Sequence, residues 1–211
     1  MQIPKRAFTA FFTAFIVVGL SLVLPKQSLA ALYNGSGILG HSDVSGNPIY
    51  TASGPNNGPN DHGFNSPFDT ALDSSGNRLF VADQNNNRVL VFNLDGSNNI
   101  SSKTAAKVLG QADLNSFIAT TTSTGMSGPK GVAFDSANNR LFVSDTANNR
   151  VLVFNTSSIS NGQAATAVLG QSGFFGNSPN TSTTTLSSPE GLAFDSSTNR
   201  LFVSDTGNNR V

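Results

Sequence analysis

Residues 129–155, PKGVAFDSANNRLFVSDTANNRVLVFN, decide the fold, because nearly the same text occurs three times. It occurs earlier at residues 67–93 as PFDTALDSSGNRLFVADQNNNRVLVFN, and later at residues 189–211 as PEGLAFDSSTNRLFVSDTGNNRV. Asp83, Asp145 and Asp205 mark the same position in the three copies and lie 62 and 60 residues apart. Self-similarity at a nearly fixed spacing is the signature of a repeat architecture.

Each copy predicts short strands joined by tight turns. In the second copy, the apolar run 132–134 is followed by turn-forming residues at 136–139 and by a second run, rich in aromatic and β-branched residues, at 141–143. The polar residues 146–149 predict another turn, and residues 151–154 supply a third apolar run. The pattern therefore predicts a meander of three antiparallel strands.

A fourth strand is predicted in the first two copies, at residues 105–109 (AAKVL) and 165–169 (ATAVL), each closed by Gly-Gln. The runs LFV and VLVF do not alternate apolar with polar residues, so both faces of the sheet must be covered. Repeated four-stranded antiparallel sheets of this kind are typical of β-propeller blades, which lie between neighbouring blades. A β-sandwich or β-helix of similar hairpins is the alternative. We therefore predict an all-β propeller with about three blades present, at 67–111, 129–171 and an incomplete 189–211.

The repeated text P-x-G-[VL]-A-F-D-x-x-x-N-R-L-F-V-S-D-T-x-N-N-R-V resembles the NHL repeat. The resemblance covers residues 67–211 apart from two long inserts, and it implies a β-propeller, commonly of six blades. The first copy departs from the pattern, because Asp69 and Leu72 stand where the other copies have Gly and Phe. A six-bladed ring needs more residues than this chain has, so we expect a fragment of a longer protein. Assembly of a ring from several copies is the alternative.

Residues 1–30 predict an export signal. Lys5 and Arg6 precede an apolar stretch at residues 7–24, and Ser28-Leu29-Ala30 has the small-x-small pattern that signal peptidases recognise. Cleavage after Ala30 is the simpler interpretation, but the apolar stretch is also long enough to stay as a membrane anchor. Either outcome places the repeats outside the cytoplasmic membrane, in a secreted or periplasmic protein.

Residues 31–66 contain a short stretch that resembles the end of the fourth strand. The text GILGH at residues 37–41 resembles KVLGQ at 107–111 and AVLGQ at 167–171. The segment 31–66 therefore reads as one orphan strand followed by a long loop. In a propeller such a strand can complete the last blade and remove the exposed edges of the sheets.

Composition excludes some classes of protein. Removal of residues 1–30 leaves 9 basic and 12 acidic residues, and the six remaining arginines all lie inside the repeats. This weakly acidic balance argues against nucleic acid as a partner, since that binding requires clustered Lys and Arg. The chain has no cysteine, so its stability cannot depend on disulfides. Membrane contact is expected only through the N-terminal segment, if it is not cleaved.

Long inserts rich in Ser, Thr, Gly, Asn and Pro separate the copies, at residues 42–66, 112–127 and 172–188. Because strands of a meander alternate in direction, these inserts should lie at the same end of the blades as the turns between the second and third strands. Loops on a rigid scaffold commonly carry binding, so this loop-bearing rim is the best candidate surface.

The turn D-x-x-N-N-R supplies the candidate site residues. They are Asp83, Asn87 and Arg88 in the first copy, Asp145, Asn149 and Arg150 in the second, and Asp205, Asn209 and Arg210 in the third. An Asp at such a turn can accept backbone amides or pair with the Arg. Because the set recurs in every copy, blade construction is the favoured role, and ligand binding is the alternative.

The sequence shows no catalytic or metal-binding set. Asp83 opens a stretch that begins like an EF-hand loop, but Arg88 stands where Gly is needed and Leu94 where the bidentate Glu is needed. The only two histidines, His41 and His62, lie outside the three copies. No Ser-His-Asp spacing and no phosphate-binding glycine loop is present. We therefore expect no catalytic residue, no metal and no cofactor.

Three hypotheses for the function follow. The first is an exported, non-enzymatic propeller that presents its loop-bearing rim to a protein or a glycan. The second is an enzyme, because propellers that resemble this one include peptide-amidating lyases, streptogramin lyases and sugar lactonases, whose catalytic residues would lie in further blades. The third is the extracytoplasmic sensor domain of a membrane protein. Fold alone does not select among them.

Overall fold

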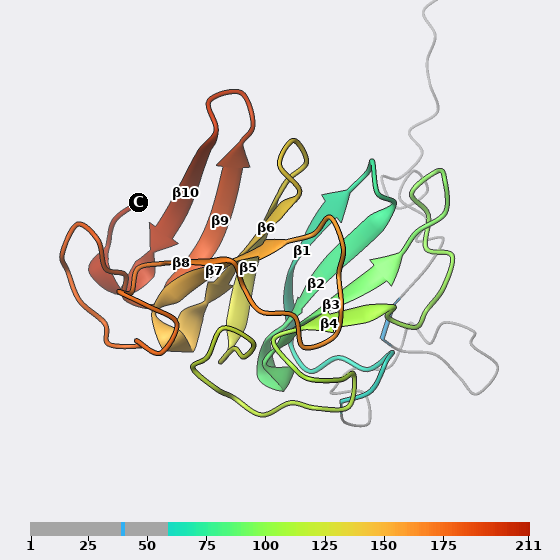
Figure 1. The fold of residues 1–211 in the computed structure, drawn as a ribbon, viewed down its shortest axis with the longest axis horizontal. Helices are drawn as coiled ribbons and strands as arrows, with labels where there is room; N and C mark the ends of the chain where they lie inside the picture. The colour runs from blue at the N-terminus through green and yellow to red at the C-terminus, as the bar shows by residue number, and fades with distance from the viewer. Residues whose placement is uncertain (1–38, 41–58) are drawn as a thin grey trace, which may run out of the picture. The chain divides into compact units, whose positions relative to one another are not determined.

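The computed structural model describes residues 39–40 and 59–211, which form three antiparallel sheets in succession along the chain (Figure 1). Sheet 1 contains β1 (Pro67–Asp73), β2 (Arg78–Asp83), β3 (Arg88–Asn93) and β4 (Lys107–Leu109). Sheet 2 contains β5 (Pro129–Asp135), β6 (Arg140–Asp145), β7 (Arg150–Asn155) and β8 (Ala167–Leu169), and sheet 3 contains β9 (Pro189–Asp195) and β10 (Arg200–Asp205). Within each sheet, every strand pairs with the next in sequence, so the predicted meander is confirmed.

The turns form where the sequence predicts them. The first and second strands of each sheet are joined by a turn that ends on an Asn with positive φ, namely Asn77, Asn139 and Asn199. The second strand of each sheet continues into a single turn of 3₁₀ helix, which is η1 (Gln84–Asn86), η2 (Thr146–Asn148) or η3 (Thr206–Asn208). An Asn with left-handed backbone angles ends each of these turns, because Asn tolerates that conformation better than other side chains with a Cβ.

Each sheet has two apolar faces, which we name by their residues. Face A carries the central Phe of the second strand and the Ala paired with it: Phe80 with Ala71, Phe142 with Ala133, and Phe202 with Ala193. Face B carries the apolar residue at the end of the first strand and its partner: Leu72 with Leu79, Phe134 with Leu141, and Phe194 with Leu201. Because side chains alternate along a strand, the two sets point to opposite sides of the sheet.

Successive sheets pack face A against face B. Phe80 of sheet 1 contacts Phe134 of sheet 2, with ring centroids 5.6 Å apart, and Phe142 of sheet 2 stacks on Phe194 of sheet 3 at 5.4 Å. The apolar strands β3 and β7 are buried on both faces, apart from their last residue, as the lack of alternation predicts. Burying a Phe or Leu side chain stabilises a fold by roughly 1.5–3 kcal/mol, so these interfaces are the main source of stability.

The structure differs from the prediction in the fourth strands. They are shorter than predicted, at three residues each, because only Lys107–Leu109 and Ala167–Leu169 pair with their neighbours. Sheet 3, predicted to be incomplete, has two strands, and its predicted third strand is represented by one bridge between Asp205 and Arg210. The four-stranded blade is therefore confirmed for sheets 1 and 2.

The predicted orphan strand lies mostly outside the described residues, as does the predicted signal at 1–30. Leu39 and Gly40 are described, and Leu39 packs against the buried cluster on face B of sheet 1. A Cβ placed on Gly40 would lie 2.8 Å from the ring of Phe64, just as one on Gly110 would lie 2.8 Å from Met126. Leu39 and Gly40 thus take the position beside sheet 1 that the end of β4 takes beside sheet 2. Within the described ranges, no helix combines the length and hydropathy needed to cross a membrane.

Candidate functional site

The Asp and Arg of each predicted set form the same hydrogen-bonded cluster in every sheet, and the cluster is fully buried in sheets 1 and 2. In sheet 2, the Arg150 guanidinium donates from Nε to Asp145 Oδ2 at 2.7 Å, and Asn148 Nδ2 donates to the same oxygen at 2.9 Å. The other carboxylate oxygen of Asp145 accepts the backbone amide of Ser127 at 2.6 Å. Asp83 and Asp205 have equivalent partners at 2.6–2.9 Å. The carboxylates are therefore saturated by groups of the chain itself.

The arginines of these clusters join consecutive inserts. Arg88 donates from Nη2 to the Gly63 carbonyl at 2.8 Å, in the insert before sheet 1, and from Nη1 to the Leu114 carbonyl, in the insert after it. Arg150 likewise donates to the Gly125 carbonyl at 3.0 Å in one insert and to the Phe174 carbonyl in the next. The inserts and the Asp-to-Arg turns therefore lie at the same end of the sheets, as predicted.

The left-handed asparagines add a second set of links. Asn87 Nδ2 donates to the Phe117 carbonyl at 2.9 Å, and its Oδ1 accepts the amide of Gly128 at 2.8 Å. Asn149 makes the same two bonds, to the Asn177 carbonyl and from the Ser188 amide. One side chain thus fixes an insert and the entry to the next sheet.

Two glutamines that sequence reasoning did not select complete the framework. Gln111 Nε2 donates to the carbonyls of Asn87 and Ile118, at 2.8 and 2.9 Å, and its Oε1 accepts the Ile118 amide at 3.1 Å. Gln171 donates in the same way to the carbonyls of Asn149 and Ser178. The signal available in the sequence was the Gly-Gln pair that closes both fourth strands. We name each Asp, Asn, Arg and Gln set a rim clamp: Asp83, Asn87, Arg88 and Gln111 for the first, and Asp145, Asn149, Arg150 and Gln171 for the second.

Burial sets the electrostatics of the clamps. The side chains of Asp83, Arg88, Asp145 and Arg150 are fully buried, whereas that of Arg210 is 36% exposed. Burial raises the pKa of Asp145, against the opposing charge of Arg150. Burial acts to raise the pKa of Asp205 too, but the hydrogen bonds from Ser187, Asn208 and Arg210 outweigh it and bring that pKa below its ordinary value. The three carboxylates lie in separate sheets, so they do not form one acid–base site.

The clamps hold loops that display different side chains. The first clamp fixes the backbone on either side of Phe117 and Ile118, whose side chains are 53% and 69% exposed. Asn177 and Ser178 occupy the equivalent, exposed positions in the insert at residues 172–188. That insert instead presents Phe175, which is 81% exposed. The framework is the same in both inserts, but the surface that it presents is not.

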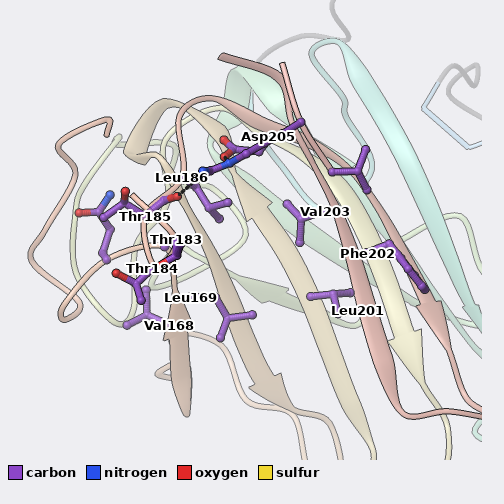
Figure 2. A pocket seen from close by; sticks show the side chains of 14 residues that line it. Val168, Leu169, Thr183, Thr184, Thr185, Leu186, Leu201, Phe202, Val203 and Asp205 are labelled. Atoms are coloured by element: carbon purple, nitrogen blue, oxygen red, sulfur yellow. Dashed lines mark hydrogen bonds and ion pairs between the residues drawn. The ribbon is translucent and has the colours of Figure 1, made fainter. Parts of the chain in front are cut away.

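A cavity of about 740 Å³ opens between β8, β10 and the insert at residues 172–188. Figure 2 shows Leu201 and Val203 on β10 turned toward Leu169 and Leu186 across this space. Around sheet 2 the equivalent residues, Leu109, Met126, Leu141 and Val143, form one buried cluster with Leu152 and Phe154 of β7. The cavity therefore corresponds to the space that a third strand fills in sheet 2, and its only charged lining residues, Asp205 and Arg210, are already paired.

Histidine and metal chemistry find no support in the described ranges. His62 is exposed and its Nδ1 lies 2.6 Å from Asp61 Oδ1, while His41 lies outside the described residues. Residues 39–40 and 59–211 contain no group of three or more His, Asp or Glu side chains that could hold a metal ion. The cluster that resembled an EF-hand start is the first rim clamp.

Comparison with known proteins identifies the repeat. The family model of the NHL repeat matches residues 64–92, 126–154 and 186–211. Among solved structures, a nidogen/laminin complex is similar with a TM-score of 0.42 and 21% identity over 65% of this chain. An auxiliary nutrient-binding protein from Bacteroides thetaiotaomicron VPI-5482 is similar with a TM-score of 0.48 and 15% identity over 81% of this chain.

This chain spans about 40% of the length of each of those two proteins. Curated protein sequences gave no match. Each matched segment begins three residues before the first strand of a sheet; the first two extend through most of the third strand, to Phe92 and Phe154, and the last ends at Val211. Residues 64–211 therefore carry three NHL repeats, and their sheets are blades of a β-propeller.

Proposed function

We propose that this protein is an exported, non-enzymatic binding module that presents its loop-bearing rim to a protein or glycan. The observation that carries the proposal is the contrast between the two inserts: identical clamps hold Phe117 and Ile118 in one and Asn177 and Ser178 in the other. A fixed framework with variable side chains is what a binding surface requires.

The exposed pair Phe117 and Ile118 has the properties of a binding anchor. Exposure of these large apolar side chains to water is unfavourable, so covering them with a partner would release free energy. Their backbone is held by three hydrogen bonds with the side chains of Asn87 and Gln111. Ordering a loop on binding costs free energy, so a loop that is already held binds more tightly. An aliphatic side chain beside an aromatic one favours a protein surface over a glycan, which binds mainly to aromatic faces.

The nine predicted site residues support this function indirectly. The Asp and Arg side chains of the first two clamps are buried, and the Asn and Gln side chains are bonded to the backbone of the inserts, so the clamps act by positioning the rim rather than by touching the ligand. We extend this role to Asp205, Asn209 and Arg210. Export rests on Lys5, Arg6, the apolar stretch and the Ser28-Leu29-Ala30 pattern, and cleavage after Ala30 would give a secreted or periplasmic product.

The test is to select binders on the purified full chain from a displayed peptide library and from a glycan array. Binders of the rim should lose about tenfold or more in affinity toward the variant F117S/I118S, because anchor residues dominate binding energy. The matched control N177A/S178A changes the equivalent positions of the insert at residues 172–188 and should bind normally. The variant N87G keeps the left-handed backbone but frees the loop, so it should show a smaller loss.

Two results would contradict the proposal. Binders that respond equally to F117S/I118S and to the control would place the site elsewhere. Turnover of a lactone, peptide or glycan substrate by the full chain would instead support the enzyme hypothesis.

A further inference from the structure

The insert at residues 172–188 carries an acceptor motif for N-linked glycosylation. Its residues Asn180-Thr181-Ser182 have the pattern Asn-x-Ser, with an x other than Pro, that marks such acceptors in the surface loops of exported proteins. At the corresponding place the insert at residues 112–127 has three threonines, at 120–122, and therefore lacks the asparagine. The two inserts thus differ in their capacity to accept a sugar.

The backbone at Asn180 is held in the same way as the backbone at Thr120. The Asn180 carbonyl accepts Asn208 Nδ2 at 2.8 Å, and the Thr120 carbonyl accepts Asn148 Nδ2 at 3.0 Å. The amides of Asn180 and Thr120 each donate to the carbonyl six residues later, at 3.4 and 3.1 Å. The motif therefore lies on a fixed stretch of the insert, and these bonds do not use the Asn180 side chain.

The side chain of Asn180 is open to modification. Its Oδ1 accepts the Thr181 amide at 2.7 Å, while its Nδ2, the atom to which a sugar is attached, has no hydrogen bond within residues 39–40 and 59–211. Every residue from 177 to 184 is exposed, so no packed side chain stands in the way of a bulky group. The exposed run includes Ser182, whose hydroxyl the motif requires.

A second motif, Asn-Ile-Ser at residues 99–101, is less suited to carry a sugar. Asn99 Nδ2 donates to Asp95 Oδ1 and Oδ2, at 3.3 and 3.2 Å, and the Asn99 amide donates to Oδ1 at 2.9 Å. A sugar on Nδ2 has to displace the two side-chain bonds. The turn around Asp95 therefore opposes modification of Asn99.

A third motif, Asn-Thr-Ser at residues 155–157, begins at the last residue of β7. Asn155 is exposed, but Phe154 and Thr156 on either side of it are both 0% exposed. A sugar on Asn155 starts at the packed end of a strand rather than on a protruding loop. Among the motifs in the described ranges, the one at Asn180 is therefore the most open.

We propose that Asn180 is a site of N-linked glycosylation. The inference rests on export, which is part of the proposed function, because the transferase acts on chains that have crossed the membrane. Asn180 Nδ2 attacks the anomeric carbon of a lipid-linked sugar pyrophosphate. The bond from that carbon to Nδ2 forms, the bond to the pyrophosphate oxygen breaks with its electron pair, and the amide loses one proton to a base. No oxidant or reductant takes part.

The sugar gives the two inserts of the rim opposite surfaces. The insert at residues 172–188 carries a bulky, hydrated group, whereas the insert at residues 112–127 keeps Phe117 and Ile118 bare. The glycan therefore adds solubility to one part of the rim and leaves the proposed anchor accessible.

The test uses the full chain, with its own residues 1–30, expressed in yeast. Protein recovered from the medium should contain a heavier species that peptide N-glycosidase converts to the unmodified one. This enzyme turns the acceptor Asn into Asp, so digestion in heavy-oxygen water should label residue 180. N180Q removes the acceptor and S182A removes the hydroxyl, so each should lose this label completely.

The variant T120N is the matched control. It creates the motif at the corresponding place of the insert at residues 112–127, where Thr120 is exposed and its backbone is held in the same way, so it should add a second glycan.

Protein in the medium without a sugar on Asn180 would overturn the inference and leave export intact. So would a sugar carried only by another asparagine, such as Asn99 or Asn155. Retention of the whole, unprocessed chain in the cytosol would instead contradict export, and the glycosylation with it.

Discussion

Sheets 2 and 3 begin with nearly the same text and have the same local geometry, but they differ in burial. Their first two strands pair in the same register, Asn149 and Asn209 both have a φ of 53°, and the Arg–Asp bonds measure 2.7 and 2.6 Å. Phe142 is 5% exposed and Phe202 49%, and the Arg150 side chain is fully buried while that of Arg210 is 36% exposed.

The difference shows which properties belong to a repeat and which to its neighbours. Turns, hairpin register and the Asp–Arg pair depend on residues a few positions apart, so they form in both sheets. Burial depends on the sheet that packs alongside, so the same pair contributes different amounts to stability. Substitutions at equivalent positions in the two sheets should therefore have unequal effects.

The largest difference is expected at the clamp arginines. R150A leaves the buried Asp145 carboxylate unpaired and takes donors from the carbonyls of Thr122, Gly125 and Phe174, so it should lower the free energy of unfolding by about 3–5 kcal/mol. R210A should cost about 1 kcal/mol or less, because solvent reaches that pair. Urea unfolding followed by circular dichroism measures both.

Lysine at the same positions is the control for charge. R150K should recover only part of the loss, since an ammonium group cannot reproduce the forked contacts. Equal losses of stability for R150A and R210A would mean that burial does not determine how much the Arg–Asp pair contributes to the free energy of unfolding.

A smaller difference is expected at the glycines of the first strands. A Cβ on Gly131 would overlap the Glu190 carbonyl oxygen of the next blade, so G131A should destabilise the fold by about 1–3 kcal/mol. At Gly191 the nearest atom to such a Cβ is Ser204 Oγ at 3.1 Å, and G191A should stay within about 0.5 kcal/mol of the wild type. The same urea titration measures the stability of both variants. A G131A variant as stable as the wild type would show that the blades can separate at no cost.

The smallest effect concerns Asp135 and Asp195, which are the last residues of β5 and β9. Burial raises the pKa of Asp135, but hydrogen bonds from Asn138 and Arg140 bring it below its ordinary value. Hydrogen bonds from Thr198 and then Ser197 lower the pKa of Asp195 from 3.8 to about 2. T198V should therefore raise the pKa of Asp195 toward 3.8, as followed by NMR titration of its carboxyl carbon.

The sign of the pH effect follows from that shift. A folded pKa below the unfolded one means that ionised Asp195 stabilises the fold above pH about 4, and that this contribution disappears as the pH falls through about 2. T198V should narrow the interval between the folded and the unfolded pKa of Asp195, whereas T198S keeps the hydroxyl and should preserve that interval. A pKa that stays near 2 in T198V would assign the shift to Ser197 instead.

Sheet 1 shows where reasoning from sequence stopped. Asp69, in place of Gly, looked like a local weakening of the pattern, but Asp69 Oδ2 accepts the Val132 amide of the next blade at 3.0 Å. In sheet 2 one of the links to the next blade is made by Ser144, whose Oγ donates to the Glu190 carbonyl at 2.6 Å, and sheet 1 has Ala82 at that position. Sheet 1 thus has Asp69 where sheet 2 has Gly131, and Ala82 where sheet 2 has Ser144, and it replaces one hydrogen bond between blades by another. This exchange is visible only in the packed structure.

The sequence by itself determined the repeat, the meander, the positions of the turns and the pairing of each Asp with the Arg five positions later. These features depend on contacts between residues close in the chain, whose spacing can be counted. The tertiary structure alone decided that Gln111 and Asn87 hold the Phe117 loop and that Arg88 joins two inserts. Those outcomes depend on residues brought together across blades, and no local pattern records which surfaces meet.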